Sequence, residues 1–172
     1  GGTILADAIS SGGVPNHSAV VRNEIGATLS ISNVTLESTQ DVNNYVSLVM
    51  NNQGTISEME NVTLRAPRGY AVWNHGGHIG TIDSCTIDVA YGIYNRNVRG
   101  SNAISAGYNI ASYGTIDLIK DSAVTAGQYA INNNAVITEL NNCTFTAHPD
   151  SAQVNTYGTA AANVQGNVQA YT

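Results

Sequence analysis

Apolar and polar residues alternate along the chain in short stretches, and one five-residue pattern returns repeatedly. Its clearest copies are YAVWN at 70–74, YGIYN at 91–95, YNIAS at 108–112 and YAINN at 129–133, with weaker copies at 19–23 and 47–51. Alternating β-branched and aromatic residues predict β-strands. The copies end roughly 22 residues apart on average, a spacing typical of repeat architectures. Their last residues are Asn23, Asn51, Asn74, Asn95, Ser112 and Asn133.

The segment after each copy repeats a second pattern. Apolar residues stand five, eight, eleven and thirteen positions after Asn51, and at the same offsets after Asn74. Each unit thus holds three short strands and cannot bury its own apolar face, so successive units must stack. We therefore expect an all-β fold, a single-stranded parallel β-helix with about six or seven turns of roughly 22 residues, stacked about 4.8 Å apart. The two apolar sets are Ile56, Met59, Val62 and Leu64, and Ile79, Ile82, Cys85 and Ile87.

The repeat also sets the expected domain organisation. The whole chain, 1–172, forms one domain in which 19–150 makes the regular turns. Residues 1–18 are expected to form an N-terminal partial turn, and 151–172 a C-terminal turn or cap. The segment RNVRGSNAISAG after Asn95 is irregular, and we assign it to one imperfect turn that ends at Ser112.

The turn length and the column of asparagines resemble the right-handed parallel β-helices of the pectate-lyase-like superfamily. The resemblance covers roughly 19–150 and implies an asparagine ladder at one sharp bend of every turn. A side-chain amide carries two donors and one acceptor, so it can bond to the amides above and below it. Each such bond contributes about 0.5–1.5 kcal/mol net. The expected ladder consists of Asn23, Asn51, Asn74, Asn95, Ser112 and Asn133.

The same register predicts which side chains face solvent. Val72 and Asn74 face inward, which places Ala71 and Trp73 outside, with Tyr94 beside Trp73 one turn later. The tyrosines that begin each copy, at 70, 91, 108 and 129, are expected to form an inward or edge-lying stack. Exposed aromatic pairs often stack on sugar rings or on a partner protein. The candidate ligand-binding residues are Trp73, Tyr94, His75, His78 and Arg96.

The stretch YAVWNHGGHIGTID, 70–83, has the composition of a chemical site, because it holds two histidines and an aspartate. A zinc site needs three convergent protein ligands, and Asp83 would have to join His75 and His78. In the repeat, both histidines occupy positions held by Asn52 and Thr55 one turn earlier. We therefore interpret them as side chains of a solvated loop and expect neither a metal nor another cofactor.

No catalytic set emerges from the acidic residues. The superfamily's lyases use clustered carboxylates to hold calcium, together with a basic residue, and its hydrolases use paired aspartates with Gly-His-Gly and Arg-x-Lys motifs. Here no two acids are adjacent, GHI at 77–79 departs from the Gly-His-Gly motif, and Arg-x-Lys does not occur. Glu37, Arg65 and Asp88 share one outward column, which we interpret as a surface ion-pair ladder. We assign no catalytic residue.

The two cysteines, Cys85 and Cys143, fall in one inward column of the repeat. Counting one turn for Asn95 and another for Ser112 places them three turns apart, or roughly 14 Å at about 4.8 Å per turn. A disulfide requires Cα atoms closer than about 7 Å. We expect two free, buried thiols.

Composition narrows the functional classes. The net charge is −6, and the six lysines and arginines are scattered, which disfavours nucleic-acid binding. No apolar run is long enough to insert into a membrane. We hypothesise a non-enzymatic structural or adhesion module of a bacterial surface protein or phage fibre, located outside the cell or on the virion. Its partners would be a cell-surface glycan, a host protein or further copies in a homotrimer. The alternative is a carbohydrate-active enzyme of the same fold, a polysaccharide lyase or glycoside hydrolase.

Overall fold

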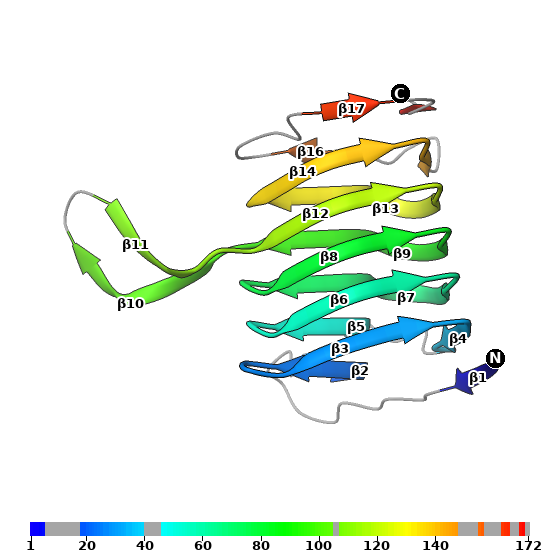
Figure 1. The fold of residues 1–172 in the computed structure, drawn as a ribbon, viewed down its shortest axis with the longest axis horizontal. Coiled ribbons are helices and arrows are strands. Elements are labelled where there is room, and N and C mark those ends of the chain that lie inside the picture. The colour runs from blue at the N-terminus through cyan, green and yellow to red at the C-terminus, as the bar shows by residue number, and fades with distance from the viewer. Residues whose placement is uncertain are drawn as a thin grey trace.

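The computed structural model describes residues 1–5, 18–39, 46–104, 107–147, 155–156, 163–165 and 169–170. The expected terminal segments, 1–18 and 151–172, lie largely outside these residues. The described chain is all-β and winds into a parallel β-helix (Figure 1). None of its segments is a helix that could cross a membrane.

One side of the coil, which we call face 1, is a six-stranded parallel sheet. Its six strands come from six successive coils, in agreement with the expected number of turns. They are β3 (Thr28–Ser32), β6 (Thr55–Glu60), β8 (His78–Asp83), β12 (Thr115–Lys120), β14 (Val136–Asn141) and β17 (Asn163–Gln165).

A ten-stranded sheet forms the other two sides of the coil. Face 2 contains β1 (Gly2–Leu5), β4 (Val34–Glu37), β15 (Thr144–Ala147), β18 (Gln169–Ala170) and the first halves of β7 (Thr63–His75), β9 (Thr86–Arg96) and β13 (Ala123–Asn134). Face 3 contains β2 (Ser18–Glu24), β5 (Val46–Asn52), β16 (Asn155–Thr156) and the second halves of β7, β9 and β13. The strand register shifts between the two halves, at Ala66/Tyr70 and again at Ala126/Tyr129.

The predicted apolar columns form the core. On face 1, Ile56 pairs with Ile79 and Met59 with Ile82, and all four side chains are fully buried. The outward columns also follow the predicted register, because Glu37 pairs with Arg65 and Arg65 with Asp88. Arg65 Nη1 lies 3.1 Å from Glu37 Oε1.

The asparagine ladder stands at the corner where face 3 ends and face 1 begins. Nδ2 of Asn23 donates to Oδ1 of Asn51 at 2.9 Å, and Asn51 donates to Asn74 at 2.9 Å. Asn74 donates to Asn95 at 2.8 Å, and Asn95 donates to Asn133 at 2.8 Å. All the amides therefore point the same way along the helix axis. The second hydrogen of each interior amide is directed at backbone carbonyls, such as Gly77 O at 2.8 Å from Asn74 Nδ2.

The expectation that Ser112 belongs to this ladder is wrong. Asn95 bonds directly to Asn133. Soon after Asn95 the chain leaves the coil as an antiparallel hairpin of β10 (Val98–Ile104) and β11 (Gly107–Ser112), and it rejoins the coil at β12 (Figure 1). The Ser112 hydroxyl donates to the carbonyl of Gly76 instead. Tyr108 likewise lies in β11, outside the predicted tyrosine stack.

A second corner, between face 1 and face 2, has a left-handed backbone that the sequence pattern did not predict. Its residues have φ between 48° and 54°. Asparagine and aspartate adopt this conformation more readily than most residues. At the corner, Asn61 Nδ2 donates to Asn33 Oδ1 at 2.8 Å, and Asn142 Nδ2 donates to Asp121 Oδ1 at 2.6 Å. The corner residues are Asn33, Asn61, Ser84, Asp121 and Asn142.

Both cysteines are free and buried, as expected, but their predicted spacing is wrong. Ser122 is their common neighbour: its Oγ accepts from Cys85 N at 3.1 Å, and its carbonyl accepts from Thr144 N, next to Cys143, at 2.9 Å. They stand two coils apart because the hairpin does not form a coil. Two spacings of about 4.8 Å still exceed the reach of a disulfide.

We expect both thiols to be unreactive in the folded protein. Burial raises the pKa of Cys85 to about 11 and also raises the pKa of Cys143. The nucleophilic thiolate is therefore scarce at pH 8. Mass spectrometry after iodoacetamide treatment should show no adduct on native protein and two adducts after unreduced denaturation. A disulfide, or rapid native alkylation, would contradict the buried column.

Candidate ligand-binding face

Residues 70–83 belong to the repeat, as the backbone around the ladder shows. A Cβ added at Gly77 would lie 2.3 Å from Asn51 Nδ2, and one at Gly54 would lie 2.4 Å from Asn23 Nδ2. A Cβ added at Gly114 would lie 2.7 Å from Asn95 Oδ1. These three glycines follow the ladder in successive coils, and each leaves space for an amide. Gly77 therefore has the same structural role as its counterparts in the neighbouring coils.

The two histidines of this stretch lie on different faces. His75 is half-buried on face 3, where it pairs in register with Asn52 and Arg96. His78 is exposed on face 1, and its Nε2 lies 2.8 Å from Asp117 Oδ2. Asp83, the expected third ligand, binds Lys120 Nζ at 2.7 Å, and this bond is the main reason that its pKa is lowered. Across the described part of the chain, no three potential metal ligands come together.

Face 3 carries three neighbouring outward columns that contain the remaining candidates. The first holds tyrosines, the second is partly aromatic, and the third is polar. The columns are Tyr70, Tyr91 and Tyr129; Arg22, Met50, Trp73, Tyr94 and Asn132; and Glu24, Asn52, His75, Arg96 and Asn134.

The aromatic rings of these columns pack into one cluster. The Trp73 and Tyr94 rings are 5.3 Å apart, as the sequence register predicts, and Tyr70 lies 4.8 Å from Trp73 and 5.7 Å from Tyr94. Tyr91 continues the stack, 4.8 Å from Tyr70 and 5.3 Å from Tyr129. These distances are typical of favourable aromatic pairs. The tyrosines therefore pack in one cluster with Trp73 and Tyr94, and none of the three belongs to the apolar core cluster of the coil.

The prediction that Trp73 presents an exposed surface is wrong, since the side chain is only 5% exposed. It does point outward, but the rings of Tyr70 and Tyr94 lie against it. Ala71, also predicted to face out, is fully buried in the core next to Val72. Two consecutive core residues break the strict alternation of β7, whose register with β9 shifts just before them, between Ala66 and Tyr70. The ligand-binding role assigned to Trp73 stays a prediction.

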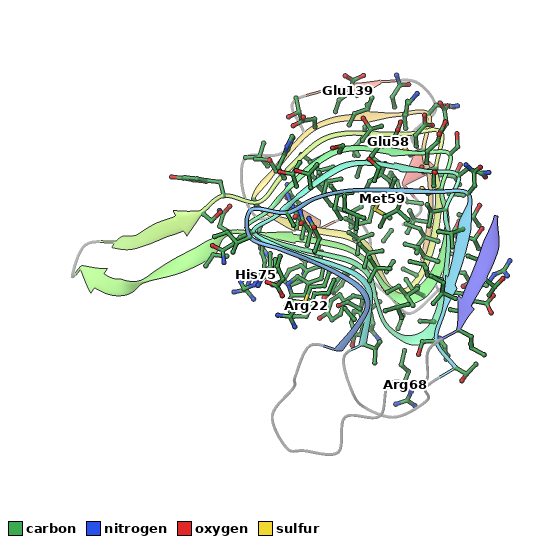
Figure 2. All side chains as sticks on the ribbon, turned by 60° about the horizontal axis from the view of Figure 1, so that its bottom comes forward. Arg22, Glu58, Met59, Arg68, His75 and Glu139 are labelled. Atoms are coloured by element: carbon green, nitrogen blue, oxygen red, sulfur yellow. The ribbon has the colours of Figure 1, made fainter. Side chains whose placement is uncertain are left out.

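The half-buried residues around the cluster supply polar groups. Arg96 Cζ lies 5.9 Å from the Tyr94 ring centroid, within the range of a cation–π contact. Asn134 Nδ2 donates to Asn132 Oδ1 at 3.2 Å beside that ring. Figure 2 shows Arg22 and His75 on the same side of the coil. We call the exposed part of this surface, centred on Tyr94, Arg96, Asn132 and Asn134, the aromatic face.

Glu24 is the only carboxylate among the residues of these three columns that the structure describes. Its Oε2 accepts a hydrogen bond from Asn52 Nδ2 at 2.6 Å, and Arg22 pairs with its other oxygen. The bond from Asn52, followed by the contact with Arg22, lowers the pKa of Glu24. The carboxylate is thus held ionised at neutral pH, which suits a hydrogen-bond acceptor rather than a general acid.

Comparisons of the chain with protein-family models, with curated proteins and with solved structures find no match.

Proposed function

We propose that this protein is a non-enzymatic, glycan-binding β-helical module of the right-handed, pectate-lyase-like kind, and that it serves in a bacterial surface protein or phage fibre. The aromatic face carries the proposal. It combines ring surface with amide and guanidinium donors on one rigid sheet, where positions are fixed by strand pairing. Sugar rings present C–H faces, which stack on aromatic side chains, and hydroxyls, which hydrogen-bond to polar side chains. The aromatic face supplies both kinds of group.

A binding role is supported over a hydrolytic one by the chemistry of the same surface. Most glycosidases place two carboxyl groups on either side of the scissile bond, one of them with a raised pKa. Among the described residues of the three outward columns of face 3, Glu24 is the only carboxylate, and its pKa is lowered. The six-coil stack of hydrogen-bonded strands also supports a shaft-like role, because it gives a stiff scaffold for a surface-displayed site.

The test is a glycan array probed with labelled protein, followed by titration of the best ligand. We expect Tyr94→Ala to weaken binding at least about tenfold, which corresponds to about 1.4 kcal/mol. Tyr113 is the matched control, since it is 62% exposed and lies off the aromatic face. Tyr113→Ala should bind like the parent protein. Trp73 is unsuitable for this test because its burial couples binding to folding.

Three results would count against the proposal. The wild-type array could yield no ligand, Tyr94→Ala could bind unchanged, or Tyr113→Ala could lose binding equally. A parallel assay for new reducing ends or unsaturated products on the bound glycans tests the enzymatic alternative. Turnover there would replace the binding module with a carbohydrate-active enzyme.

A further inference from the structure

The hairpin of β10 and β11 is a sheet of its own. Its two strands pair only with each other, and it projects away from the coil at the ladder corner (Figure 1). A two-stranded hairpin alone in water is marginally stable, and lasting order requires further strands or a packing partner. The asparagine ladder continues from Asn95 to Asn133 without the hairpin. The order of the hairpin therefore calls for a packing partner other than the ladder.

Close packing and hydrogen bonds connect the base of the hairpin to the neighbouring coils. Gly76 has φ +64°, and a Cβ there would lie 2.5 Å from Val98 Cγ2 and 3.1 Å from Ser112 Cβ. The Ser112 hydroxyl bonds to the Gly76 carbonyl. Asn97 ties both sides of the junction, since its Oδ1 accepts from Gly114 N at 3.0 Å and its Nδ2 donates to Asn134 O at 3.4 Å. These contacts hold the arm away from its own coil.

The arm, residues 98–112, contains a single charged residue, Arg99, and lies in a longer segment that lacks carboxylates. The 28 residues between Asp88 and Asp117 contain no carboxylate and two arginines, Arg96 and Arg99, although the chain as a whole has a net charge of −6. Arg96 lies against Tyr94 on the aromatic face, whereas Arg99 belongs to β10.

The opposite charge gathers on face 1. Its outward positions carry five carboxylates against Lys120 and His78, and Figure 2 shows Glu58 and Glu139 on this side of the coil. Lys120 neutralises Asp83, and His78 contacts Asp117, which leaves Glu58, Glu60 and Glu139 without an ion-pair partner among the described residues. Half-buried Leu118 follows Asp117 and pairs in register with Glu139. The five carboxylates are Glu58, Glu60, Asp83, Asp117 and Glu139.

We propose that the hairpin is an assembly arm that docks on face 1 of a second copy of this chain. The arm brings a carboxylate-free, arginine-bearing sheet to a surface of excess negative charge, and such complementarity steers association and fixes register. Arm and acceptor are different parts of the surface, so each copy can offer one arm and receive another. Mutual exchange or a ring of copies closes the assembly.

The first experiment compares the wild-type mass with that of a deletion variant by analytical ultracentrifugation. Removal of residues 98–113 joins Asn97 to Gly114, which reproduces the spacing Asn74-His75-Gly76-Gly77 of the preceding coil. Asn97 would take the place of Gly76, and asparagine tolerates a left-handed backbone there. We expect the wild type to form a discrete oligomer at micromolar concentrations and the variant to be a folded monomer. A monomeric wild type, or an oligomeric deletion variant, overturns the proposal.

A charge exchange tests where the arm docks. Arg99→Glu and Glu58→Lys should each raise the dissociation constant of the oligomer about tenfold or more, and the double variant should recover most of the loss. Arg65→Glu, on face 2, is the matched control and should leave the mass unchanged. If single variants assemble like the wild type, or the double variant shows no recovery, face 1 is not the acceptor and the proposal fails.

Discussion

Replacing Asn74 by alanine should lower the free energy of unfolding by about 1–3 kcal/mol, among the largest losses expected from a single polar side chain in this protein. Asn74 is fully buried, accepts from Asn51 and donates to Asn95. Its removal leaves the Asn51 amide without its acceptor and the Asn95 carbonyl without its donor. Buried polar groups that lose their partners are costly because water cannot replace them.

The measurement is chemical denaturation followed by circular dichroism. His78→Ala is the control, because His78 is exposed and takes part in one surface ion pair, so its loss should cost under about 0.5 kcal/mol. The reverse ranking would mean that His78 stabilises the fold more than the ladder does. That result would contradict a structural role for the asparagines.

Gly77→Ala should destabilise the protein by about 1–3 kcal/mol through overpacking, although it adds a single methyl group. The added Cβ would stand 2.3 Å from Asn51 Nδ2 and 2.9 Å from Asn74 Oδ1. Neither atom can retreat without breaking a rung of the ladder, since both belong to the hydrogen bond that joins Asn51 and Asn74.

A second glycine supplies the control for this substitution. At Gly127 the nearest atom to an added Cβ is Ala90 Cα at 3.4 Å, an ordinary contact, and φ is not positive. Gly127→Ala should therefore be neutral or slightly stabilising, because alanine restricts the unfolded chain. Thermal melts of the two variants should differ clearly. If both behave alike, close approach at Gly77 does not control stability.

The sequence was sufficient to predict the parts of the fold that depend on local alternation and on a repeated period. Val49, Val72, Ile93 and Ile131 are all fully buried in one column, as their positions in the repeat require. The ladder was predicted from the repeated asparagine column through its resemblance to the right-handed parallel β-helices, and the donors and acceptor of a side-chain amide supported it.

The hairpin was missed because its strands carry the same local pattern as the coils. YNIAS at 108–112 resembles YAVWN at 70–74, yet Ile110 pairs with Arg99 in an antiparallel sheet, whereas Val72 pairs with Ile93 in a parallel one. Alternation reports that a segment is extended, not which strand it will pair with. That choice depends on contacts distant in sequence, among them the junction at Gly76.

The candidate site was predicted only in part, for a related reason. The alternation of inward and outward residues along each strand placed Trp73 and Tyr94 side by side on the outside, and their rings are adjacent. The alternation of inward and outward residues could not reveal that Ala71 and Val72 both enter the core, or that the Tyr70 ring, expected to be inward or edge-lying, packs against Trp73. Trp73 and Tyr70 are buried whereas Tyr94 is half-buried, so we place the candidate site at Tyr94, beside Arg96 and Asn132.

The junction between Asn97 and Gly114 also makes this corner a natural grafting point. The rung from Asn95 to Asn133 has the same length, 2.8 Å, as the rung from Asn74 to Asn95, although the chain makes a long excursion between the first pair. Lengthening such a loop adds little entropic cost once its ends are fixed. Foreign peptides inserted there should leave the register of neighbouring coils intact. A β-helix that accepts insertions at one corner can vary the segments exposed there while the stacked coils keep their structure.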